Sequence, residues 1–288
     1  MRIFITGGTG FIGKPLVELL RQAGHRLLVL SRRPPKKKQA GTTLLKGDLS
    51  TLSKLKPSLK KFKPETVIHL AWEGIPDYSA SQSIKNLKYS LDLMLLAAAI
   101  GCKKFIAAGT CWEYGNRIGA VGEAMTVEPS EIFPLTKDCF RRLAESVSRQ
   151  RNVCLIWTRF FYVYGPGQKQ SSLIPHLIKA SSKQKRLDIK TPGVQHDFIY
   201  VADAARAVAM IVKRAKQSAI YNIGSGKLTT VGQIVKIIHP QYTYTVGASQ
   251  PGCYADISKI RRAIGWRPQV DIETGIKMTA AWFKQNGK

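Results

Sequence analysis

The sequence predicts an α/β protein with a doubly wound parallel sheet and a smaller C-terminal α/β region. With 288 residues, of which 44% are hydrophobic, the chain can fill a core larger than that of an average domain. It opens with a short apolar segment, a glycine-rich turn and an amphipathic segment. Further apolar segments then alternate with helical patterns through the first half, which is the order that a doubly wound sheet requires.

The first element is a strand over residues 3–6, followed by a glycine turn and a helix. The apolar positions on one face of that helix are Ile12, Leu16, Leu19, Leu20 and Ala23. Gly24 then ends the helix, because glycine is the common residue just past a helix C-terminus. Residues 26–30, four of which are apolar, predict the second strand, so the order of the unit is strand, turn, helix, strand.

The turn of this unit carries glycines at the spacing Gly8-x-Gly10-x-x-Gly13. Glycines at these places let the turn close tightly, let the backbone approach a pyrophosphate, and let the helix pack against the sheet. The N-terminus of the helix then favours the negative charge of the phosphates. A dinucleotide is therefore the expected ligand of the first unit.

Ser31, Arg32 and Arg33 follow the second strand, where an NAD-preferring site has an acid that holds the ribose hydroxyls. A carboxylate repels a 2′-phosphate, whereas a hydroxyl and guanidinium groups hold it. We therefore expect NADP(H) rather than NAD(H) as the cofactor. The alternative is that the two arginines merely begin a basic loop.

The chain carries a net charge of +27, from 45 basic and 18 acidic residues. Its basic residues are concentrated in residues 32–38 and 54–63. Such charge is compatible with nucleic acid, an anionic membrane surface or phosphorylated small molecules. No nucleic-acid-binding motif accompanies it. We interpret it as a solvated basic face and expect neither nucleic acid nor a membrane as a partner.

The five cysteines form no C-x-x-C pair, which indicates reduced thiols rather than disulfides or a zinc site. The longest apolar run, residues 91–100, is far shorter than the roughly 20 residues of a membrane-spanning helix. Met1 leads straight into a strand without a charged leader. We expect a cytoplasmic protein without a bound metal.

Further strands are predicted over residues 66–72 and 104–110. The segments that follow one another along the chain are TGGTGFIG, GDL, HLAW, GTCWEYG, TKD, RFFYVYGPGQ, HDFIYVADAARAV, YNIGSGKLTTVGQI and ADISKIRRAIGWRP. In this set and order the chain resembles the extended short-chain dehydrogenase/reductase family, in its NAD-dependent epimerase/dehydratase group. The resemblance implies a dinucleotide-binding Rossmann domain over residues 1–164, to which residues 198–223 return, and a mainly substrate-binding region over residues 165–288.

The resemblance also implies roles for individual residues at the cofactor. The residues expected at the pyrophosphate are Thr6, Gly7, Gly10, Phe11, Ile12 and Gly13. Asp48 and Leu49 are expected at the adenine, and Leu70 and Ala71 beneath the cofactor.

For catalysis, Thr110 matches the family's serine or threonine, and Lys137 matches the lysine that also hydrogen-bonds the nicotinamide ribose. Phe133 stands where the family has the tyrosine of its Tyr-x-x-x-Lys motif. There a phenol, whose pKa a nearby ammonium lowers, gives or takes the proton while a hydride moves between nicotinamide and a sugar carbon. Phenylalanine has no proton to give.

Three explanations of Phe133 stay open. First, Phe133 is the natural residue and another group replaces the tyrosine. Second, Phe133 is an engineered substitution for tyrosine, made to trap a complex. Third, the protein has lost its redox chemistry. The candidate replacements are Tyr114, Tyr162, Cys111 and a water held by Thr110.

The residues after Thr110 narrow the reaction. The family's 4,6-dehydratases have an acidic pair there, and Cys111 and Trp112 replace it, which argues against dehydration. The combined 3,5-epimerase/4-reductases use a cysteine and a histidine at places that Trp112 and Ser172 take here. The leading hypothesis is therefore an NADP(H)-dependent reductase of a 4-keto-(deoxy)sugar nucleotide. The alternatives are a nucleotide-sugar 4-epimerase and a non-catalytic NADP-binding or sensor protein.

The residues expected at the substrate are Cys111, Trp112, Tyr162, Lys169, His196 and Gln250. Gln250 takes the place of an arginine that clasps the diphosphate in the family. Either other cations such as Lys169, Lys179 or Arg186 hold the diphosphate, or the substrate is not a typical sugar nucleotide. His196 either contacts a phosphate or makes a structural hydrogen bond. A homodimer is expected through helices over about residues 81–100 and 136–150, as is common in the family.

Overall fold

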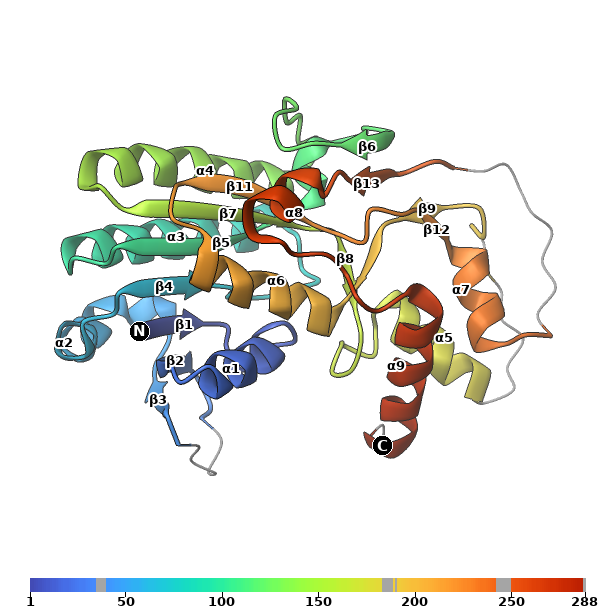
Figure 1. The fold of residues 1–288 in the computed structure, drawn as a ribbon, viewed down its shortest axis with the longest axis horizontal. Coiled ribbons are helices and arrows are strands. Elements are labelled where there is room, and N and C mark those ends of the chain that lie inside the picture. Colours follow the sequence, from blue (N-terminus) through green and yellow to red (C-terminus); the bar gives the residue numbers. More distant parts are fainter. Residues whose placement is uncertain (35–39, 183–188, 190, 242–249, 287–288) are drawn as a thin grey trace.

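The computed structural model describes residues 1–34, 40–182, 189, 191–241 and 250–286. Lys36, Lys37 and Lys38 of the basic run, and the candidate diphosphate ligand Arg186, lie outside the described residues. Figure 1 shows a central sheet with helices on both sides of it and a second group of helices that includes the C-terminal one.

The central sheet has seven parallel strands in the order β11-β7-β5-β4-β1-β2-β3. Their bounds are β1 Arg2–Thr6, β2 Arg26–Ser31, β3 Thr42–Lys46, β4 Thr66–His69, β5 Lys104–Thr110, β7 Cys154–Phe160 and β11 Ala219–Ile223. The strand order reverses between β1 and β4, and ligands of such sheets bind outside the carboxyl ends of the strands at this switch point. The glycine turn after β1 therefore lies where a ligand is expected.

Helices bury both faces of the sheet. One face is covered by α1 (Gly13–Gln22), α6 (Val201–Arg214) and α8 (Ser258–Ile264), and the other by α2 (Leu52–Phe62), α3 (Ala80–Ala99) and α4 (Ile132–Arg151). Within β1, Ile3 and Ile5 belong to the first apolar cluster and Phe4 to the second, as the alternation of side chains along a strand requires. This double burial explains why the strands are nearly continuous apolar runs.

A smaller group of elements packs around a separate apolar cluster. Its helices are α5 (Leu173–Ser182), α7 (Val231–Ile238) and α9 (Ile272–Asn286). Short strand pairs join β8 (Tyr162–Tyr164) to β10 (Phe198–Tyr200), β9 (Gln195–His196) to β12 (Thr229–Thr230), and β6 (Gly119–Val121) to β13 (Cys253–Ala255). These pairings bring together segments that are more than thirty residues apart along the chain.

The doubly wound parallel sheet predicted from the sequence is confirmed. The strand expected over residues 66–72 ends at His69, so residues 70–72 belong to the loop at the switch point. The helix expected from about residue 136 already begins at Ile132, which puts Phe133 and Lys137 one turn apart on the same helix face. Among the described residues, no helix is long and apolar enough to cross a membrane.

Candidate active site

The glycine turn after β1 is closed so tightly that side chains do not fit. Gly7 has a φ of +73°, and a Cβ atom on it would lie 2.7 Å from the backbone nitrogen of Ala71. A Cβ atom on Gly13 would lie 2.1 Å from the carbonyl oxygen of Gly7. The first turn of α1 has no acidic residue, and Ile12 provides no side-chain cap for its N–H groups. The turn, at the N-terminus of α1, thus fits an anionic group such as a pyrophosphate.

Thr6 lies beneath this turn rather than on its surface. Its hydroxyl hydrogen-bonds Nδ1 of His69 at 2.7 Å, and Nε2 of His69 hydrogen-bonds the hydroxyl of Ser90 at 2.9 Å. Burial, together with the charge of Lys137, lowers the pKa of His69 to about 3, so the imidazole is neutral. This buried chain of hydrogen bonds joins β1, β4 and α3 at the switch point, and the sequence analysis did not identify His69.

The residues after β2 meet a carboxylate that the sequence analysis missed. Ser31 is buried, whereas Arg32 and Arg33 are exposed. The Nη1 atom of Arg32 lies 2.8 Å from Oε1 of Glu73, and its Nε lies 4.0 Å from Oδ2 of Asp48. Arg33 makes no recorded hydrogen bond or ion pair within the described part of the chain. Arg32 therefore lies with two carboxylates at the expected adenosine end of the site, and the next residue, Arg33, is exposed.

Thr110 and Lys137 come from β5 and α4. The hydroxyl of Thr110 accepts a hydrogen bond from the backbone N–H of Trp112 at 3.3 Å, which caps the short 3-10 helix η2 (Cys111–Tyr114). The ammonium of Lys137 donates to the carbonyl oxygen of Ala108 at 2.8 Å and lies 3.8 Å from the ring centre of Trp72. Burial lowers the pKa of Lys137 to about 7, against the opposing charge of Glu113.

Phe133 is at the centre of a group of four aromatic side chains, which we call the aromatic cluster: Trp72, Tyr78, Trp112 and Phe133. Its ring centre lies 5.5 Å from that of Trp72, 4.8 Å from that of Tyr78 and 5.7 Å from that of Trp112. The rings of Tyr78 and Trp112 also touch, at 5.3 Å. Phe133 is 7% exposed, so apolar contacts hold its ring in place.

Tyr162 and His196 extend the aromatic cluster toward the smaller group of elements. The indole Nε1 of Trp112 donates to the hydroxyl of Tyr162 at 3.1 Å. The rings of Tyr162 and His196 are stacked with their centres 3.9 Å apart. Gln250 is exposed, and its carbonyl accepts from the backbone N–H of Gln195, next to His196. The expected substrate residues Trp112, Tyr162, His196 and Gln250 thus follow one another along one side of the site.

The cations expected at a diphosphate are placed differently. The ammonium of Lys169 donates to the carbonyl oxygen of Ile75, in the loop that leads to Tyr78. Lys179 lies on α5, and its ammonium donates to Oε1 of Gln170 at 3.1 Å. Of these two, Lys169 is therefore the one tied to the loop beside the aromatic cluster.

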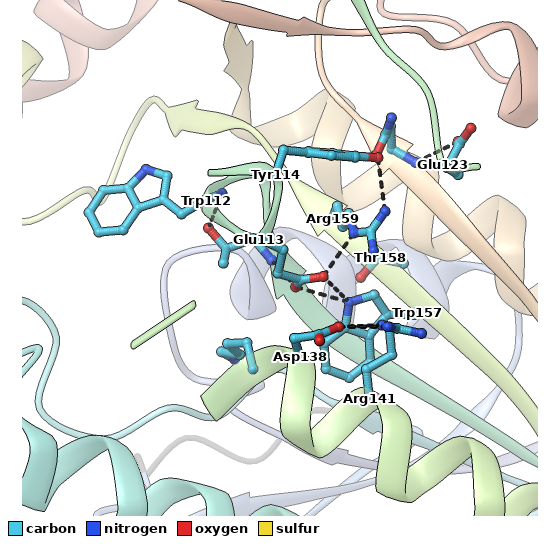
Figure 2. Close-up of polar contacts among 12 residues, drawn as sticks. Trp112, Glu113, Tyr114, Glu123, Asp138, Arg141, Trp157, Thr158 and Arg159 are labelled. Atoms are coloured by element: carbon cyan, nitrogen blue, oxygen red, sulfur yellow. Dashed lines mark hydrogen bonds and ion pairs between the residues drawn. The ribbon is translucent and has the colours of Figure 1, made fainter. Parts of the chain in front are cut away.

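A buried ion pair between Glu113 and Arg159 joins η2 to β7 (Figure 2). The carboxylate of Glu113 accepts from Nε of Arg159 at 2.8 Å, from Nε1 of Trp157 at 3.0 Å and from the backbone N–H of Thr110 at 2.9 Å. Arg159 also donates to the hydroxyl of Tyr114 at 2.9 Å. Burial raises the pKa of Glu113, while Arg159 opposes that effect. The network fixes the backbone position of Thr110.

Hydrogen bonding and burial distinguish among the side chains that are candidates to replace the missing tyrosine. The hydroxyl of Tyr114 is fully used, because it donates to Oδ1 of Asn222 at 2.8 Å while accepting from Arg159. Cys111 is 4% exposed, and burial raises the pKa of its thiol well above the usual value. Tyr162 remains at the site, and Tyr78, which the sequence analysis missed, lies closer to Phe133. The signal that could have found Tyr78 is its place in the loop directly after a central parallel strand.

Comparison with known proteins agrees with this class of fold and site. The family model described as the NAD-dependent epimerase/dehydratase family matches residues 3–224. A UDP-glucuronate 4-epimerase of Thermodesulfobacterium geofontis is 27% identical over 98% of this chain and 96% of its own. A dTDP-6-deoxy-L-talose 4-dehydrogenase (NAD(+)) of Aggregatibacter actinomycetemcomitans is 26% identical over 79% of this chain and 85% of its own.

Solved structures with the same fold cover the whole chain. MoeE5 in complex with UDP-glucuronic acid and NAD has a TM-score of 0.85 and 26% identity, with 99% of both chains covered. The UDP-glucose 4-epimerase of Thermotoga maritima has a TM-score of 0.88 and 23% identity over 100% of both chains, which shows the fold alone. The protein is thus an enzyme of the extended short-chain dehydrogenase/reductase class. Within it, the chain belongs to the NAD-dependent epimerase/dehydratase family.

Proposed function

We propose that this enzyme reduces the keto group at carbon 4 of a 4-keto-(deoxy)sugar nucleotide with NADPH. The observation that carries the proposal is the convergence of Thr110, Lys137 and the aromatic cluster at the carboxyl ends of β4 and β5. The similarity to a 6-deoxysugar-nucleotide 4-dehydrogenase supports chemistry at that carbon. We also propose residues 165–288 as the main source of substrate contacts.

When bound, the nicotinamide dinucleotide supplies the hydride. The hydroxyl of Thr110 is positioned to donate a hydrogen bond to a substrate oxygen, because its own oxygen accepts from Trp112 while its hydrogen stays available. Lys137, with a pKa near 7, can hydrogen-bond a ribose and carries a partial positive charge near neutral pH. The aromatic cluster adds apolar ring surface beside Lys137.

The preference for NADP(H) over NAD(H) depends on two opposing electrostatic effects near Arg32 and Arg33. Glu73 holds Arg32 and would repel a 2′-phosphate, whereas Arg33 is exposed and available to it. We expect NADPH to bind at least roughly tenfold more tightly than NADH, which is about 1.4 kcal/mol. Glu73→Gln should increase this ratio and Arg33→Ala should reduce it. Fluorescence titration measures both ratios, and equal affinities in the native protein would refute the NADP(H) assignment.

The second candidate is a nucleotide-sugar 4-epimerase, favoured by the similarity to a UDP-glucuronate 4-epimerase. An epimerase retains its cofactor and inverts a 4-hydroxy sugar without net consumption of reduced nicotinamide. Mass spectrometry of the denatured protein identifies any retained dinucleotide and nucleotide sugar. A protein that binds the cofactor but changes no sugar nucleotide in either assay would instead be a sensor.

We also propose that the enzyme forms a homodimer through α3 and α4. Large apolar side chains of these two helices are exposed: Ile84 by 55%, Leu95 by 53%, Leu135 by 42% and Leu143 by 48%. Neighbouring helices that expose several such side chains form an apolar face that a second copy can cover.

A further inference from the structure

Within the described part of the chain, Tyr78 is the tyrosine whose ring contacts Phe133, and its hydroxyl is open to a ligand. Its ring packs between those of Phe133 and Trp112, at 4.8 Å and 5.3 Å. Among the described residues its hydroxyl has no hydrogen-bond partner, and its oxygen atom is not fully buried. The phenol is therefore positioned by its ring, while its oxygen is left free to meet a substrate.

The oxygen atoms of the other two phenols considered for the site, Tyr162 and Tyr114, each accept a hydrogen bond. The hydroxyl of Tyr162 accepts from Trp112, and its ring is stacked on His196. That of Tyr114 is buried in the hydrogen bonds with Arg159 and Asn222. Tyr78 thus differs from Tyr114 in having an uncommitted proton, and from Tyr162 in having its ring in direct contact with Phe133, the position that lacks a proton.

The loop that carries Tyr78 is anchored on both sides. The side chains of Gln82 and Asn86, both on α3, donate to the carbonyl oxygen of Glu73 at 2.9 Å. The ammonium of Lys169 donates to the carbonyl oxygen of Ile75. These contacts tie the loop to α3 and to the segment after β8, so the position of the Tyr78 ring is fixed from two directions.

We propose that Tyr78 is the proton donor that replaces the tyrosine absent at position 133. This inference rests on the proposed function. As the carbonyl carbon of the substrate takes a hydride from the reduced dinucleotide, its C=O π bond breaks and its oxygen takes the proton of Tyr78. The O–H bond of Tyr78 breaks with its electron pair left on the phenolate oxygen, and a proton from water then restores the phenol.

The surroundings of Tyr78 keep the phenol protonated. Burial raises the pKa of Tyr78 above its usual value. Tyr162 of β8 interacts electrostatically with Tyr78, and the Asp77 carboxylate next to it in the loop accepts from the backbone N–H of Ser79. Lys137 of α4 lies 6.0 Å from the ring of the neighbouring Phe133, and Lys169 donates to the carbonyl oxygen of Ile75 in the same loop. A protonated phenol is the form that a reduction needs, because the substrate oxygen must receive a proton.

The test compares Tyr78→Phe with Tyr162→Phe and with Tyr89→Phe, a control on α3 outside the site. The probes are UDP- and dTDP-4-keto-6-deoxyglucose with NADPH. Tyr78→Phe should slow single-turnover reduction by roughly 10²–10⁴-fold, the scale of a positioned acid, with NADPH affinity unchanged. Phe133→Tyr in that background should recover at least roughly tenfold, since the new phenol would lie in contact with the ring at position 78.

A second readout does not depend on turnover. The tyrosine absorbance of the cofactor-free protein is titrated with and without the keto sugar nucleotide, and the difference between native and Tyr78→Phe protein isolates this phenol. The sugar nucleotide should raise its pKa, because the carbonyl oxygen accepts a hydrogen bond from the neutral hydroxyl. An unchanged titration, an unchanged reduction rate in Tyr78→Phe, or an equal loss in Tyr162→Phe would overturn the assignment. If the native protein reduces neither sugar, the proposed function itself fails.

Discussion

Lys137 is a buried cation at the centre of the candidate site. It is 6% exposed, and within the described residues its ammonium has a carbonyl oxygen and an indole ring as neighbours but no carboxylate in ion-pair contact. The carbonyl and the ring offset part of the desolvation cost. The part of the desolvation cost that is not offset lowers the pKa of Lys137. The side chain is thus maintained against a cost in stability, as is common where a site needs a titratable group near neutral pH.

That cost predicts the effect of Lys137→Met. Below about pH 7 the lysine is charged in the folded and the unfolded protein, so the full desolvation penalty is present. Between about pH 7 and pH 10.5, the usual pKa of lysine, the unfolded chain binds more protons than the folded one. The desolvation penalty of Lys137 is therefore lost progressively as the pH rises through this range. The variant should therefore melt above the native protein at pH 6, and the gap should narrow as pH approaches 10.5.

Differential scanning calorimetry across this range measures the gap. Lys88→Met removes an exposed lysine that pairs with Asp92, and it serves as the control. A gap for Lys137→Met that does not change with pH would show that the ammonium is not desolvated as described.

At the scale of elements, the candidate site depends on the junction of β5, η2 and β7. Glu113 and Arg159 are 0% and 1% exposed at their side chains, and their ion pair joins η2 to β7. A Cβ atom on Gly109 would lie 2.2 Å from Nε1 of Trp157, so the two strands also meet too closely for any larger residue there. The backbone of Thr110 is therefore held by packing and by the carboxylate of Glu113 together.

Removing one charge from this ion pair should be costly. Glu113→Gln leaves the guanidinium of Arg159 buried without a counter-charge, which typically costs about 3–5 kcal/mol. The matched control is Glu128→Gln, which breaks the exposed pair with Arg117 and should cost less than about 1 kcal/mol. Urea unfolding compares the two variants, and similar midpoints for both would contradict the role given to Glu113.

At the scale of the whole molecule, the proposed dimer gives a direct test of the α3 and α4 surface. The double change Leu95→Glu and Leu143→Glu puts charges on that apolar face and should yield a monomer in light scattering. Ile118→Glu changes a side chain that is 67% exposed next to β6 and should leave the assembly unchanged. A native protein that is already monomeric would refute the dimer.

The sequence predicted the sheet well because its signals are local. The glycine turn, the apolar strands and the helix periodicity each act within a few residues, and β5 has the bounds predicted for it. The candidate site was predicted less completely, because its contacts are long-range. Tyr78 meets Phe133 from a loop 55 residues away, and Glu73 reaches Arg32 across 41 residues. Neither pairing has a periodic or spacing signal in the chain.

The most direct test of the proposed function is the reaction of the native protein with NADPH and a 4-keto-6-deoxy sugar nucleotide. Nicotinamide absorbance measures consumption of the cofactor, and mass spectrometry of the sugar nucleotide measures the product. The account predicts one molecule of NADPH consumed for each keto group converted to a hydroxyl, with the nucleotide retained. It would be contradicted if NADPH were bound but not consumed while a 4-hydroxy sugar nucleotide changed its configuration at carbon 4, since that result defines an epimerase.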